Sequence, residues 1–158
     1  MLDRDRTRQW FVHALEKSRR EQNFAIWAFV IMPEHAHVLI FPRSKVYSTS
    51  AIEKAIKQSC ARRALAWLRK NHPAWLEKLR GALTEQGQRY HFWQPGGGYD
   101  RNVVEDHTAW ASIEYFHMNP VRRGLVDIPT DWVWSSARAY AGFEEVVMDV
   151  DLCPVVHH

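Results

Sequence analysis

Cysteine is scarce in this sequence, and long apolar runs are missing from it. Of its 158 residues only Cys60 and Cys153 are cysteines, which is too few for a disulfide framework or a cysteine zinc site and suits a reducing cytoplasm. No stretch reaches the roughly 18 apolar residues that a membrane-spanning helix needs. The start of the chain is charged and lacks the apolar centre of a signal peptide. We therefore expect neither a membrane protein nor a small secreted disulfide scaffold.

The excess of positive over negative charge is also small. The formal net charge is +3, with 46% hydrophobic and 25% charged residues, an ordinary balance for a globular chain. Such a mildly basic chain permits nucleic-acid binding without requiring it. The eight tryptophans are many for this length, and tryptophan serves both in cores and as a stacking surface for bases. The length predicts one domain over residues 1–145, followed by an irregular C-terminal tail over residues 146–158.

Helices are predicted where apolar side chains recur at three- and four-residue spacing. The segments with this pattern are 3–21, 51–70 and 104–118. The last of these helices should stop at Asn119, because the residue before a proline disfavours the helical conformation.

Strands are predicted by short apolar runs that are rich in β-favouring residues. Residues 24–32 and 35–42 are two such runs, and the short link between them makes an antiparallel hairpin. Residues 88–94 form another predicted strand, whereas residues 74–87 are ambiguous and allow a short helix closed by Gly81. This order of elements predicts an α+β sandwich in which helices pack on an antiparallel sheet.

Two histidines share one face of the second predicted strand. His35 and His37 are two residues apart, and alternate residues of a strand point the same way. Ala36 between them should point to the opposite, buried face. Two imidazoles side by side can bind one divalent cation, but the pattern alone more often marks two partly exposed histidines without a ligand.

The third predicted helix carries a tyrosine and an asparagine on one face. Tyr115 and Asn119 are four residues apart and therefore stacked one turn from each other. A tyrosine hydroxyl is a poor nucleophile by itself, but beside a metal that withdraws charge from a phosphate it can attack phosphorus. The amide oxygen of Asn119 suits Mg²⁺ or Mn²⁺. Taken alone, Tyr115 fits a half-buried helix tyrosine better, and we expect His117 to point away from it.

Basic and aromatic side chains alternate along much of the chain. Arginine and lysine can bind phosphates while aromatic rings stack on unpaired bases. A solvated charged surface explains the same pattern, and by itself explains it better. The residues that we expect at a DNA interface are Arg62, Arg69, Trp93, Arg122 and Arg123.

Four segments taken together resemble one family. IMPEHAHVLIFP is similar to the histidine-hydrophobe-histidine segment of HUH endonucleases, and EYFHMNPVRRGLV is similar to the tyrosine helix of their single-tyrosine branch. RYHFWQPGGGYD and WVWSSARAYAG resemble the Trp-Gln/Tyr-Asp and Trp-Ser-Ser segments of the same branch. Over roughly residues 2–142 the chain thus resembles the REP-associated tyrosine transposases, relatives of small insertion-sequence transposases. Motifs in this order are far more specific than two histidines and favour the catalytic interpretation.

The resemblance implies a fold, a metal and a substrate. The fold would be the ferredoxin-like HUH sandwich. His35, His37 and Asn119 would bind Mg²⁺ or Mn²⁺, and Tyr115 would attack a phosphate of single-stranded DNA beside a palindromic hairpin. The attack would leave a 5′-phosphotyrosine link and a free 3′-hydroxyl that can later rejoin, which is transposase chemistry. The resemblance also implies a bacterial, nucleoid-associated protein in the cytoplasm, and a homodimer is one of the assemblies that it allows.

The chain departs from the family pattern in two places. Family members usually have a further strand before the first helix, so either a central strand is missing or the start codon is misassigned. A missing strand would leave unpaired backbone groups beside the histidine strand, which a partner chain or a rearranged segment would have to cover. Glycine also occupies positions 96–98, where relatives carry bulkier or basic residues. The missing strand favours an alternative, a non-catalytic remnant that binds DNA hairpins, and a structural domain without a DNA role is the third interpretation.

Overall fold

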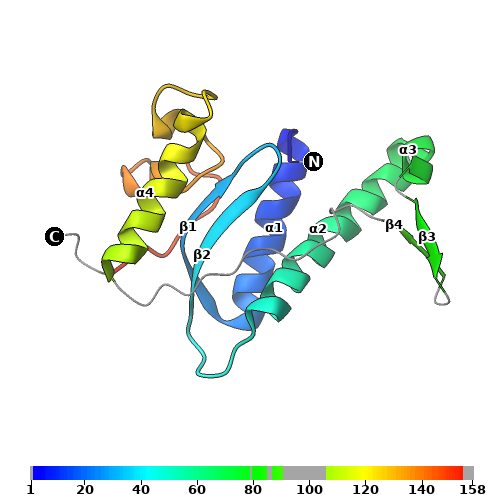
Figure 1. The fold of residues 1–158 in the computed structure, drawn as a ribbon, viewed down its shortest axis with the longest axis horizontal. Helices are drawn as coiled ribbons and strands as arrows, with labels where there is room; N and C mark the ends of the chain where they lie inside the picture. Colours follow the sequence, from blue (N-terminus) through cyan, green and yellow to red (C-terminus); the bar gives the residue numbers. More distant parts are fainter. Residues whose placement is uncertain (1, 79, 85–86, 91–105, 155–158) are drawn as a thin grey trace.

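A computed structural model describes residues 2–78, 80–84, 87–90 and 106–154 of the chain. The elements in chain order are α1 (Asp5–Gln22), β1 (Phe24–Ile31), β2 (Ala36–Pro42), α2 (Thr49–Asn71), α3 (Pro73–Lys78), β3 (Arg80–Thr84), β4 (Gly87–Tyr90), α4 (Asp106–Arg122), the 3-10 turn η1 (Pro129–Asp131) and α5 (Ala137–Tyr140) (Figure 1). As far as the described residues go, no helix is long and apolar enough to cross a membrane.

The end of α4 lies beyond the residue at which the sequence predicts it. We expected the helix to stop at Asn119, but it continues through Pro120 to Arg122, so that prediction was wrong. A proline removes one hydrogen bond of the last turn without ending the helix there. The helix ends instead where Gly124 adopts a φ of 70°, with Gly124 N donating to Val121 O and Leu125 N donating to Pro120 O. These two bonds satisfy the last carbonyls of the helix, as in a Schellman motif.

The region after α2 also differs from the prediction. Gly81 does not close a short helix, because α3 ends at Lys78 and Gly81 lies within β3. The strand predicted over residues 88–94 begins at Gly87 and is described as far as Tyr90. Its remaining residues, Trp93 among them, and the glycines at 96–98 lie outside the described residues.

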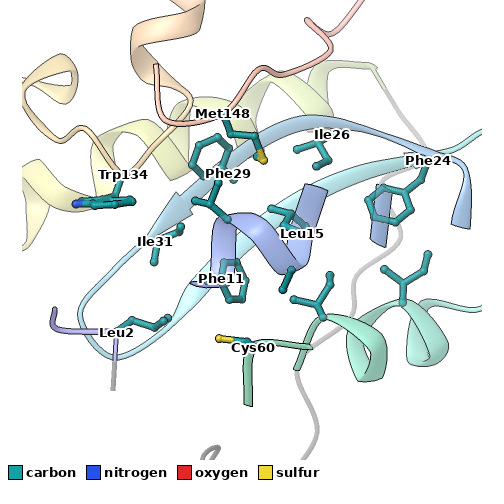
Figure 2. Close-up of a cluster of buried hydrophobic side chains, with 14 of the residues drawn as sticks. Leu2, Phe11, Leu15, Phe24, Ile26, Phe29, Ile31, Cys60, Trp134 and Met148 are labelled. Atoms are coloured by element: carbon teal, nitrogen blue, oxygen red, sulfur yellow. The ribbon is translucent and has the colours of Figure 1, made fainter. Parts of the chain in front are cut away.

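Helices cover both faces of the β1–β2 hairpin (Figure 1). α1 and α2 lie on one face, and α4 lies on the other. The larger core lies on the α1 side, where Phe11 and Leu15 pack with Phe29 of β1 (Figure 2). A smaller core between the hairpin and α4 contains Ala28 and Ile113. Because both faces of β1 are covered in this way, the strand reads as a nearly continuous apolar run.

The outer edge of β1 is closed by segments from the C-terminal part of the chain. Phe29 N donates a hydrogen bond to Ser136 Oγ, and Ser136 N donates to Phe29 O, both at 3.0 Å. Further along the strand, Ile26 N donates to Asp151 Oδ2 at 3.0 Å, and Asp151 N donates to Ile26 O at 2.9 Å. Backbone groups that would otherwise lack partners at this edge are thereby satisfied.

The segment predicted as an irregular tail packs into both cores. Residues 146–154 contain no helix or strand. Met148 is nevertheless buried in the larger core (Figure 2). Cys153 is buried in the smaller core. Cys153 N donates to the hydroxyl oxygen of Tyr140 at 3.0 Å, and that hydroxyl donates to Trp27 O at 2.7 Å. Residues 146–154 therefore pack with the hairpin, although they form no helix or strand.

The strands β3 and β4 form a sheet of their own. They pair with each other beyond the far end of α2, away from β1 and β2 (Figure 1). Among the described strands only β1 pairs with β2, so the other edge of β2 has no described strand beside it. The predicted α+β class is confirmed as a mixture of helices with a two-stranded antiparallel sheet, while the ferredoxin-like HUH sandwich stays a prediction.

Candidate functional site

The histidine pair lies on the face of the hairpin that α4 covers. His35 directly precedes β2, and His37 lies opposite Val30 of β1 in the antiparallel register. The two imidazole centroids are 4.8 Å apart, and their planes are inclined by 78°. Ala36, between them, packs against the larger core on the opposite face, as strand alternation predicts. The two rings therefore face the same side.

Helix α4 brings a tyrosine to this pair. The ring centroid of Tyr115 lies 5.9 Å from that of His37, in an edge-on arrangement. The neighbouring Phe116 stacks on His37 at 5.2 Å with planes 15° apart. Phe116 thus fixes the imidazole, whereas Tyr115 remains 48% exposed, which leaves its ring open to a ligand from solvent. The structure places His35, His37 and Tyr115, all singled out from the sequence, in one cluster.

Partial burial sets the protonation state of His37. Burial lowers the pKa of its imidazole, and the nearby charge of His35 lowers it further. The ring is therefore neutral at pH 7. A neutral imidazole keeps a free lone pair, which is the form that binds a metal ion or accepts a proton.

Glu34 lies between Arg123 and His35. Its carboxylate forms an ion pair with Arg123 at the end of α4, and its Oε1 lies 3.7 Å from Nδ1 of His35. Burial acts to raise the pKa of Glu34, but the hydrogen bond and the charge of Arg123 outweigh it, and the pKa lies below its ordinary value. No sequence motif marks Glu34 as functional, although it directly precedes the candidate ligand His35.

A second arginine, Arg122, contacts the ring of Tyr115. The guanidinium carbon of Arg122 lies 4.9 Å from the centroid of the Tyr115 ring, within the range of a cation–π contact. Arg122 and Arg123 thus both lie at the candidate site, although Arg123 is engaged by Glu34. The guanidinium of Arg122 offers a positive charge beside the phenol.

Asn119 lies one turn after Tyr115 and is only 7% exposed. In the described part of the chain, no group of three or more His, Cys, Asp or Glu side chains is placed to hold a metal ion. The sequence prediction of an amide ligand at Asn119 therefore concerns a residue type outside that group. By donor type, two imidazole nitrogens and one amide oxygen suit a divalent cation whose remaining ligands are waters. The role of Asn119 stays a prediction.

His117 is a packing residue rather than part of the cluster. Its Nε2 lies 2.8 Å from the hydroxyl oxygen of Ser136, and its ring centroid lies 5.2 Å from that of Tyr140. Burial lowers the pKa of His117 to about 4, so the ring is neutral at pH 7. Ser136, which also bonds Phe29, thus joins α4 to the edge of β1.

Two other predicted DNA-binding residues, Arg62 and Arg69, do not join this cluster. Arg62 and Arg69 are exposed on α2. That helix packs on α1, across the hairpin from α4 (Figure 1). Trp93 lies outside the described residues. If DNA reaches all of these positions, it must do so on more than one side of the hairpin.

Comparison with solved structures finds a similar fold in a REP-associated tyrosine transposase bound to a REP hairpin. The two sequences are 20% identical, the TM-score is 0.58, and the similarity covers 98% of this chain and 81% of the other. At this identity the likeness establishes the fold alone. No family model matches the chain, and no match was found among curated proteins.

Proposed function

We propose that this chain is a metal-dependent transposase that nicks and joins single-stranded DNA beside a hairpin, with Tyr115 as the nucleophile. The observation that carries the proposal is the approach of Tyr115 to His37, 5.9 Å between ring centroids, from a helix and a strand that are far apart in the sequence. The REP hairpin bound to the structural neighbour supports hairpin DNA as the substrate. The motifs that resemble the REP-associated tyrosine transposases lead to the same assignment.

In the proposed reaction the phenolic oxygen of Tyr115 attacks the phosphorus of a DNA phosphodiester. A bond forms between these two atoms, and the bond from phosphorus to the 3′-oxygen of the preceding nucleotide breaks. The phenol loses a proton and the departing 3′-oxygen gains one. The products are a 5′-phosphotyrosine and a free 3′-hydroxyl, and attack by a 3′-hydroxyl on the phosphotyrosine rejoins the strand.

His35, His37 and Asn119 would hold Mg²⁺ or Mn²⁺ at this site. When bound, the cation would withdraw charge from the phosphate that Tyr115 attacks. The chain supports binding in two ways. The lowered pKa of His37 keeps one of its two ring nitrogens free of a proton at pH 7, and the stacked Phe116 holds the ring in one orientation before any ligand arrives.

Arg122 would bind the phosphate beside the phenol. Its guanidinium lies over the Tyr115 ring, so it is close to the place where negative charge develops during the attack. The planar guanidinium can bind two phosphate oxygens at once. Arg123 would contribute less directly, because it is paired with Glu34.

Replacing the tyrosine tests the proposal. Tyr115→Phe removes only the hydroxyl, so we expect the covalent protein–DNA adduct on a hairpin oligonucleotide with single-stranded flanks to disappear while hairpin affinity is retained. Tyr47→Phe is the matched control, because Tyr47 is 51% exposed and Tyr115 is 48% exposed. An adduct of undiminished yield in Tyr115→Phe would contradict the assignment of the nucleophile.

A non-catalytic hairpin-binding protein is the second candidate. The edge of β2 that has no described strand beside it favours this alternative, because the histidines adjoin that strand. Hairpin binding by the wild-type chain without any nicking in millimolar Mn²⁺ would support it. Location at the bacterial nucleoid and a homodimer belong to the proposal as well, and sedimentation with and without DNA would test the latter.

A further inference from the structure

A stacked aromatic pair lies at the far end of the histidine strand. Trp27 of β1 and Phe41 of β2 stack with ring centroids 4.8 Å apart and planes at 10°. This contact depends on a bulge in β1, where the pairing register shifts between Ile26 and Ala28. Because of the bulge, the side chains of both Trp27 and Ala28 lie on the α4 side of the hairpin. Bulges often re-aim a side chain next to a functional site.

Phe41 belongs to the same row of side chains as the histidines. Alternate residues of a strand share a face, so His37, Leu39 and Phe41 follow one another on the α4 side of β2. Leu39 packs against the smaller core under α4. Phe41 is 49% exposed, although its ring is large and apolar. The row therefore leads from the candidate site, under α4, to an accessible aromatic surface.

The distance from His37 to Phe41 corresponds to a few nucleotides of DNA. Phe41 is four residues beyond His37, which corresponds to about 13 Å along an extended strand. Stacked nucleotides rise about 3.4 Å each, so this is a distance of about four nucleotides. A DNA strand whose phosphate lies at Tyr115 can therefore reach Phe41 with a base only a few positions away.

We propose that Phe41, backed by Trp27, is a stacking site for one unpaired base of the single-stranded DNA flank. This inference rests on the proposed function. Stacking on an aromatic face accepts any base, so the site would hold the flank in position without reading its sequence. Trp27 limits the motion of the Phe41 ring before DNA binds, which reduces the entropy lost on binding. Cross-strand aromatic pairs also stabilise hairpins, and the experiment separates the two roles.

Two substitutions of Phe41 test the stacking site. Phe41→Leu keeps an apolar side chain but removes the aromatic face, so affinity for a hairpin with single-stranded flanks should fall about five-fold or more. Affinity for the same hairpin without flanks should not change. Phe41→Tyr should bind the flanked hairpin like the wild type. Phe143→Leu is the control, because Phe143 is 47% exposed and comes after α5 rather than within β1 or β2.

A second measurement needs no variant. Single 2-aminopurine bases placed along the flank lose fluorescence where they stack on an aromatic ring. Quenching confined to a position a few nucleotides from the cleaved phosphate supports the proposal, and uniform or absent quenching overturns it. An equal loss for both hairpins in Phe41→Leu, or no loss, also overturns it. If one of these overturning results is found while the Tyr115 adduct still forms, only the stacking site is refuted. If the wild-type chain binds no hairpin at all, the proposed function is refuted as well.

Discussion

Acidification should destabilise the fold through His117. The imidazole is buried against Ser136 and Tyr140, and burial lowers its pKa from 6.5 to about 4. The unfolded chain therefore takes up a proton on this ring more readily than the folded chain does. The stability that results from the lowered pKa is complete above pH 6.5 and is lost as the pH falls from 6.5 towards 4. At roughly 1.36 kcal/mol for each pH unit, the loss amounts to about 3 kcal/mol of unfolding free energy.

Urea unfolding at several pH values between 4 and 7 measures this loss. His117→Gln removes the titrating group, so the variant should be less stable than the wild type at pH 7 yet lose less stability on acidification. Some dependence on pH should remain in the variant, because the pKa of His37 is lowered as well. His13→Gln, at an exposed position of α1, should leave the profile unchanged. A profile as steep in His117→Gln as in the wild type would refute the reasoning.

Two further predictions concern the charges around the site. Glu34→Gln removes the charge that links His35 to Arg123. The Mn²⁺ concentration that half-saturates nicking should therefore rise about ten-fold. An unchanged Mn²⁺ titration would show that Glu34 does not position the histidine. Arg122→Ala should weaken binding of hairpin DNA and reduce the salt dependence of that binding. Arg62→Ala, on the other side of the β1–β2 hairpin, should have a smaller effect. A larger effect of Arg62→Ala would place the DNA on α2.

Local patterns in the sequence predicted the hairpin and the faces of its strands. The run around Phe29 is apolar because both of its faces are covered, and the short turn after it leaves few alternatives to antiparallel pairing. Alternation then placed His35 and His37 on one face. The approach of Tyr115 to them could not be predicted from periodicity, because no local rule relates α4 to β2; only the resemblance to a family suggested it.

Other features depend on contacts that a local pattern does not contain. Whether a helix stops at a proline depends on the residues after that proline, and here Gly124 ends α4 about one turn later than the prediction. The pairing of Glu34 with Arg123 requires the end of α4 to meet the turn between the strands. The bulge at Trp27 likewise breaks the strict alternation that sequence analysis assumes.

Closure of β1 by the C-terminal segments has a consequence for folding. The hydrogen bonds of this edge join residues 107 positions apart for Phe29 and Ser136, and 125 positions apart for Ile26 and Asp151. During synthesis the strand therefore leaves the ribosome long before its partners exist. Contacts of such long range slow folding, and an open strand edge is prone to aggregate in the meantime. A nascent chain of this protein must keep that edge protected until residues 136 and 151 have been made.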